Sequence, residues 1–73
     1  MTKTYRIEVD CAACALKMEN AARKTDGVAG ANVNFMTQKM SVDFAEGCDH
    51  RHVMESVRRN CKRAESDCEV YLS

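Results

Sequence analysis

Apolar and polar residues alternate in four segments of the 73-residue chain. Alternation with a period of two places one set of side chains on one face of an extended backbone, which is typical of a half-buried strand. The alternating apolar sets are Tyr5, Ile7 and Val9; Ala31, Val33 and Phe35; Met40, Val42 and Phe44; and Cys68, Val70 and Leu72. The pattern predicts four strands, which cover residues 4–9, 31–35, 40–44 and 68–72.

Two other segments repeat apolar residues at the spacing of a helix, three and four residues apart. We predict a first helix over about residues 13–25, which ends at Asp26-Gly27 because glycine tolerates the left-handed conformation just past a helix end. A second helix is predicted over about residues 50–63, with Asp49 as its N-cap. The expected buried stripes are Cys14, Met18, Ala21, Ala22 and Thr25 in the first helix, and Val53, Val57, Cys61 and Ala64 in the second, with Met54 at the margin.

The predicted order of elements is strand, helix, strand, strand, helix, strand. Two strand–helix–strand units in tandem are typical of the α+β ferredoxin-like sandwich, in which two helices cover one face of a four-stranded antiparallel sheet. The polar pair Thr37-Gln38 is expected at the tip of the central hairpin. The chain contains no proline and no linker-like segment, so we expect one domain over residues 1–73.

Charge and composition exclude several classes of protein. Eleven basic and eleven acidic side chains give a net charge of zero, which argues against a nucleic-acid-binding protein. The apolar stretch 11–16 is far too short to span a bilayer, and the N-terminus lacks the pattern of a secretion signal. Five cysteines, an odd and dispersed set, argue against a disulfide framework and for reduced thiols. We therefore expect a monomeric cytoplasmic protein, or a cytoplasmic domain of a membrane protein.

The close pair Cys11 and Cys14 is the main candidate for chemistry. The predicted topology puts its loop at the same end of the molecule as the 37–38 hairpin and the 64–67 connection. Cys11 is expected in that loop and Cys14 in the first helical turn, where unpaired N–H groups favour a thiolate. Two such thiolates can chelate a soft or borderline metal ion, or can carry out thiol–disulfide exchange.

The cysteine pair has three other possible explanations besides a metal-transfer site. A thioredoxin-like redox protein shares the C-x-x-C spacing, but its order of elements differs, and it is expected to carry a proline beside the motif. A structural zinc ribbon needs a second pair of ligands that this chain lacks. Packing at a helix start explains Cys14 more readily than Cys11, which lies beyond the strand.

The remaining cysteines and the histidines are expected to have structural or surface roles. Cys61 and Cys68 fall on inward-facing positions of the second helix and the last strand, where a free cysteine acts as a small apolar residue. Cys48, His50 and His52 are expected in an exposed polar loop and helix start at the opposite end from the cysteine pair.

The chain resembles the heavy-metal-associated domain, which occurs as small metallochaperones and as cytoplasmic modules of metal-transporting P-type ATPases. The stretches that carry the resemblance are D-C-A-A-C at 10–14, A-L-K-M-E-N-A at 15–21, D-G-V at 26–28, A-N-V-N-F at 31–35 and M-S-V-D-F at 40–44. They cover nearly the whole chain. The C-x-x-C motif alone is a weak signal, but in this setting it is a specific one.

The resemblance also implies a role for Asp10. Copper(I) members typically have Met-x-Cys-x-x-Cys with a neutral residue before the first cysteine, whereas members from zinc, cadmium and lead pumps often have Asp-Cys-x-x-Cys. It therefore implies a site for Zn(II), Cd(II) or Pb(II) made by Asp10, Cys11 and Cys14. The chemistry agrees, because zinc prefers four ligands and accepts carboxylate oxygen. Asp10 could also serve simply as a negative charge near a helix N-terminus.

The function implied is a non-catalytic module that exchanges a divalent ion with other domains of an efflux ATPase or with a metal-donating chaperone. A free-standing copper(I) chaperone and a thiol oxidoreductase are the alternatives. One departure from the family is Glu8-Val9, which stands where a glycine usually precedes the acid. Glu65 and Asp67 could lend a carboxylate, although we expect both to be solvated loop charges.

Overall fold

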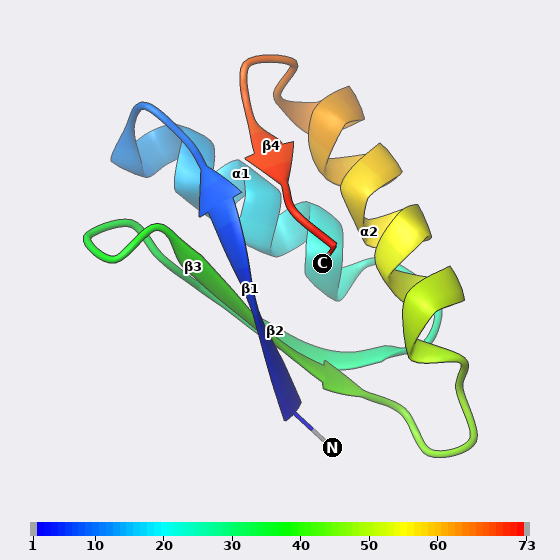
Figure 1. The fold of residues 1–73 in the computed structure, drawn as a ribbon. Coiled ribbons are helices and arrows are strands. Elements are labelled where there is room, and N and C mark those ends of the chain that lie inside the picture. Colours follow the sequence, from blue (N-terminus) through cyan, green and yellow to red (C-terminus); the bar gives the residue numbers. More distant parts are fainter. Residues whose placement is uncertain (1, 73) are drawn as a thin grey trace.

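The computed structural model describes residues 2–72 and confirms the predicted order of elements. The predicted domain limits at Met1 and Ser73 lie outside the described residues. The elements are β1 (Thr2–Glu8), α1 (Ala12–Arg23), β2 (Val28–Asn34), β3 (Lys39–Phe44), α2 (His50–Ala64) and β4 (Glu69–Val70). The strands pair antiparallel in the order β2-β3-β1-β4, and Figure 1 shows both helices on one side of this curled sheet. The fold is the predicted ferredoxin-like sandwich.

β4 is shorter than predicted. The alternation suggested a strand over 68–72, but only Glu69 and Val70 form the ladder, opposite Glu8 and Ile7 at the end of β1. The Tyr71 N–H still donates to the Arg6 carbonyl oxygen at 2.9 Å, after which the chain leaves the sheet and Leu72 is 37% exposed. The strand ends early because its pairing is limited to the last part of β1.

The core lies between the helices and the inner face of the sheet. It contains Ile7 and Met40 from the sheet and Met18, Met54 and Val57 from the helices, all 1% exposed or less. Met54, expected at the margin of its stripe, is therefore fully buried. Ala64, expected in that stripe, is exposed instead, because the last turn of α2 faces a groove between the two helices.

The local geometry of α1 follows from its ends. The helix begins at Ala12, and Cys11 is its N-cap. It ends at Arg23, two residues before the predicted end, and the chain then turns through Gly27 at φ +90°. Thr25 remains buried as predicted, because its hydroxyl donates to the Ala21 carbonyl oxygen at 2.9 Å and accepts from Asn60 Nδ2 at 2.9 Å. This bond joins the end of α1 to α2.

The other three cysteines are free thiols away from the motif. Cys61 and Cys68 are buried in the core, as predicted. Cys48 is half-buried against the core rather than exposed, and His50 is half-buried because its ring stacks on Phe44 with centroids 4.2 Å apart. The prediction of an exposed loop there was wrong for Cys48 and His50, and only His52 is exposed.

Candidate metal-binding site

The two thiols of the C-x-x-C motif meet at the start of α1. Cys11 is exposed and extended, at φ −146° and ψ 155°, and its sulfur accepts from the Cys14 N–H at 3.2 Å. The first helical turn brings Cys14 back toward it, so that the two sulfur atoms lie 3.0 Å apart within a hydrogen bond. Both thiols are free. The two cysteines that the sequence pointed to therefore lie side by side at the start of α1.

The two thiols have different proton affinities. Hydrogen bonds from the Cys14 thiol and the Cys14 backbone lower the pKa of Cys11. The hydrogen bond to Cys11, followed by one to the Glu65 carboxylate, raises the pKa of Cys14 to about 12. The pair thus holds its first negative charge on Cys11, while Cys14 keeps the proton and donates it.

Glu65 is closer to the motif than the sequence suggested. It is the C-cap of α2, half-buried, and its N–H donates to the Cys61 carbonyl oxygen at 2.8 Å. Its carboxylate accepts a hydrogen bond from Cys14, which lowers the pKa of Glu65, and Lys17 lowers it further. The only sequence signal for this contact was the topology, which placed the 64–67 connection at the same end as the motif. Asp67 is exposed, as expected.

Asp10 is exposed on the loop between β1 and α1, directly before Cys11. Within residues 2–72 its carboxylate makes no hydrogen bond or ion pair. Across the same residues, no three histidine, cysteine or acidic side chains are grouped closely enough to hold a metal ion. Of the three predicted ligands, the structure brings the thiols of Cys11 and Cys14 together. The Asp10 carboxylate lies on the adjacent residue and is not grouped with them.

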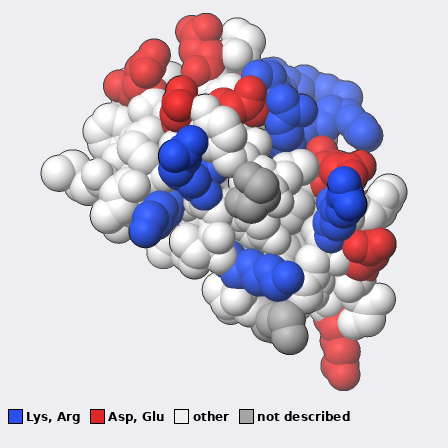
Figure 2. Space-filling model, in the orientation of Figure 1, with Lys and Arg blue, Asp and Glu red and all other residues white. Residues whose placement is uncertain are grey.

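Acidic side chains surround this end of the molecule. Glu8 and Asp10 are exposed at the end of β1 and in the following loop, and Glu65 and Asp67 lie in the connection between α2 and β4. Figure 2 shows acidic groups toward its upper left and top, where Figure 1 places these two loops, with a cluster of basic groups beside them toward the upper right. These four carboxylates place negative charge around the motif, while Lys62 and Arg63 in the last turn of α2 place positive charge beside it.

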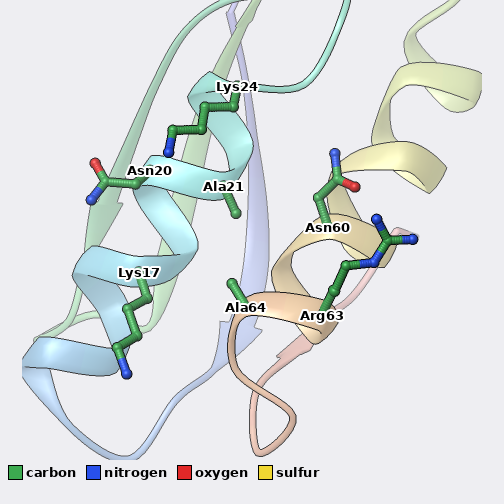
Figure 3. Close-up of a pocket in the computed structure, with 7 residues that line it drawn as sticks. All are labelled: Lys17, Asn20, Ala21, Lys24, Asn60, Arg63 and Ala64. Atoms are coloured by element: carbon green, nitrogen blue, oxygen red, sulfur yellow. The ribbon is translucent and has the colours of Figure 1, made fainter.

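A shallow groove between α1 and α2 has the opposite character. Figure 3 shows its lining residues, which are Lys17, Asn20, Ala21, Lys24, Asn60, Arg63 and Ala64. Three cations and two amides suit an anion, and a metal ion would be repelled. The cysteine loop, and not the groove, is the candidate metal centre. None of the described helices has the length and apolar character needed to cross a membrane.

Comparison with protein families gives a match to the heavy-metal-associated domain over residues 4–62. The chain is 42% identical over 48 residues to "Copper-transporting ATPase 1" of Rhizobium meliloti (strain 1021), a match that covers 66% of this chain and 6% of that protein. It is 54% identical over 35 residues to the "Zinc/cadmium/lead-transporting P-type ATPase" of Escherichia coli (strain K12), covering 48% of this chain and 5% of that protein. The chain thus spans only a small part of both relatives.

Solved structures support the fold, and one of those above 25% identity holds Zn(II). The N-terminal domain of ZntA in its Zn(II) form has a TM-score of 0.72 and 28% identity, over 96% of this chain and 88% of that one. The CopZ metallochaperone has a TM-score of 0.75 over 97% of this chain and 100% of that one, but at 19% identity it supports the fold alone. Among the curated relatives, one is named for copper transport and one for zinc, cadmium and lead transport.

Proposed function

Because the chain belongs to the heavy-metal-associated domain family, we propose that it binds one Zn(II), Cd(II) or Pb(II) ion through Cys11, Cys14 and Asp10. In this proposal residues 1–73 form one cytoplasmic domain, which transfers the ion within, or to, a metal-efflux P-type ATPase. The domain carries the ion and does no catalysis itself.

The observation that carries the choice of a divalent ion is the exposed carboxylate of Asp10 on the residue directly before the assembled thiol pair. Two thiolates and one carboxylate carry three negative charges, which leave one excess charge around a divalent ion and two around Cu(I). Zinc accepts mixed sulfur and oxygen ligands, whereas Cu(I) prefers soft sulfur ligands alone. The further acidic groups at this end of the molecule act in the same direction.

The spacing of the sulfur atoms also favours a tetrahedral ion. Bonds of about 2.3 Å at tetrahedral angles require sulfur atoms about 3.8 Å apart. Two bonds of that length in line require roughly 4.6 Å. Starting from 3.0 Å, the loop opens less for the tetrahedral ion than for a linear one.

The incomplete ligand set suits transfer rather than storage. With three ligands from this chain, the fourth position of a tetrahedral ion is open to water or to a ligand from a partner. An incoming thiolate can therefore bind before Cys11 or Cys14 leaves, and the ion passes on without release into solvent. The partners we infer are other domains of the ATPase or a metal-donating chaperone.

A titration tests this function. The reduced protein is titrated with Zn(II) and Cd(II) against a chromophoric chelator, together with Cys11→Ser, Cys14→Ser and, as a control, Cys48→Ser at the opposite end. We expect one ion per chain, with binding lost in the first two variants and kept in the control. Equal binding by all four proteins would rule out the cysteine loop as the site.

The second candidate function is a copper(I) chaperone, which the similarity to the copper-transporting relative favours. It uses the same two thiols but gives Asp10 no role as a ligand. The effect of Asp10 on the preference between the two ions therefore separates the candidates.

A further inference from the structure

Gln38 has an unusual backbone conformation beside the segment of residues 9–11 that leads from β1 into α1. This segment, which carries Asp10 and Cys11, is called the metal loop below. It is the one described non-glycine residue with positive φ, at +56°, and it closes the hairpin between β2 and β3. Left-handed backbone disfavours residues that carry a Cβ, and glycine or asparagine is the usual choice at such positions. A glutamine there is kept only when the contacts around it determine its conformation.

Those contacts are made with the end of β1. The Gln38 carbonyl oxygen accepts from the Ile7 N–H at 3.0 Å, and the side-chain Oε1 accepts from the Val9 N–H at 2.8 Å. The side-chain Nε2 donates to the Phe35 carbonyl oxygen at 2.8 Å. The amide group therefore uses both of its ends, one on its own hairpin and one on the chain leading to Cys11.

The position of this bridge fits a gap in the sheet. β1 pairs with β3 only as far as Arg6, and β4 covers the other side of Ile7 and Glu8. On the β3 side, Gln38 takes over where the ladder ends and holds the backbone at Ile7 and Val9. The next fixed point is the sulfur of Cys11, which accepts from the Cys14 N–H. The unpaired segment that carries Asp10 is thus reduced to a single residue between two anchors.

We propose that Gln38 is the positioning residue of the metal loop: its amide fixes Val9, and thereby presents Asp10 and Cys11 to the ion. This inference rests on the proposed function, in which these residues are ligands. Gln38 touches no metal and acts through the backbone. Groups that orient ligands in this indirect way typically change metal affinity about 10–100-fold when they are removed.

Gln38→Gly is the sharpest variant, because glycine accepts the left-handed backbone and only the side-chain bridge is lost. Asn34→Ala is the matched control. The Asn34 side chain caps the same hairpin by accepting from the Met36 and Thr37 N–H groups at 3.0 and 3.1 Å, whereas the Val9 N–H donates to Gln38. The two variants thus disturb one hairpin, but only one of them releases the metal loop.

Two measurements are made on the full chain: the Zn(II) dissociation constant by chelator competition, and the hydrogen exchange of the Val9 amide without metal. We expect Gln38→Gly to weaken Zn(II) binding about tenfold and to speed Val9 exchange at least tenfold. Asn34→Ala should change the Zn(II) dissociation constant and the Val9 exchange rate by less than about twofold, because its side chain does not orient a ligand. Urea unfolding shows whether each variant stays folded.

Two results would overturn the inference: unchanged Val9 exchange in Gln38→Gly, or equal losses of affinity in the two variants. If the unmodified protein binds no Zn(II), the proposed function fails, and the exchange measurement still decides whether Gln38 holds the loop. The two failures are therefore distinguishable.

Discussion

The Cys11 and Cys14 sulfur atoms lie 3.0 Å apart, yet their pKa values are shifted in opposite directions. The Cys14 thiol and N–H stabilise the Cys11 thiolate, while Cys14 keeps its proton until about pH 12. The thiolate is the reactive form of cysteine. Without metal, Cys11 should therefore react with iodoacetamide at pH 7 at least tenfold faster than Cys14, as measured by peptide mass spectrometry.

The buried thiols Cys61 and Cys68 serve as internal controls for that experiment. Burial raises the pKa of both, and they should remain unmodified while the protein is folded. Saturating Zn(II) should protect Cys11. Equal modification of Cys11 and Cys14 from the start would contradict the asymmetry described here.

Alanine substitutions at Gly27 and Gly47 distinguish two causes of lost stability, which are backbone strain and crowding of the new Cβ atom. Both have positive φ, at +90° and +81°, so alanine is strained at either position. A Cβ at Gly47 meets nothing within 4 Å, whereas at Gly27 it lies 2.7 Å from Cγ2 of the buried Val53. Gly47→Ala should cost about 1–2 kcal/mol of unfolding free energy. Gly27→Ala should cost a further 1–3 kcal/mol or so for overpacking.

Urea denaturation of the two glycine variants checks this ranking. Both glycines lie at the end of the molecule away from the motif, so Zn(II) affinity should not change in either folded variant. A Gly47→Ala protein that is less stable than Gly27→Ala would show that the crowding against Val53 is relieved cheaply.

Glu69 joins β4 to α2 through two cations. Its carboxylate accepts from Arg58 Nε at 2.9 Å and from Lys62 Nζ at 3.2 Å, and the hydrogen bond from Arg58 is the main reason that its pKa falls to about 2. Its ordinary value is 4.5, so this contribution to stability is complete above pH 4.5 and is lost as the pH falls toward 2. Ion pairs that water can reach contribute about 0.2–1 kcal/mol each.

Glu69→Gln should accordingly lower stability by about 1 kcal/mol at pH 7 and flatten the pH dependence of unfolding below pH 4.5. Glu55→Gln is the control, because its ion pair with Arg51 is longer, at 3.8 Å, and more exposed. Urea midpoints at pH 7, 4.5 and 3 measure both effects. Identical pH profiles for the two variants would remove Glu69 as a link between α2 and β4.

The sequence predicted the elements and their arrangement well, because alternation and helical spacing are strong in this chain. It overestimated the length of β4, since alternation cannot show how far the neighbouring strand extends beside it. It misjudged Ala64 and Cys48 because exposure at the ends of a helix or loop depends on how the elements diverge. These errors concern tertiary packing and not local propensity.

At the site, the spacing of Cys11 and Cys14 and their place before a helix were enough to predict the thiol pair. The sequence placed Glu65 at the same end of the molecule as Cys14 but did not predict their contact. Topology places loops and not side chains. Gln38 was predicted merely as a hairpin tip. Its bond to Val9 depends on a left-handed backbone that no periodic pattern encodes in a residue other than glycine or asparagine.

We propose that Asp10 makes the site selective for a divalent ion, and a comparison of two affinities in one variant tests this. Zn(II) and Cu(I) dissociation constants are measured under reducing conditions, by competition with chelators specific for each ion, for the unmodified protein and for Asp10→Asn. We expect Zn(II) binding to weaken about tenfold or more in Asp10→Asn, while Cu(I) binding changes by less than about threefold. Unchanged Zn(II) affinity in Asp10→Asn, together with a preference of the unmodified protein for Cu(I), would contradict it.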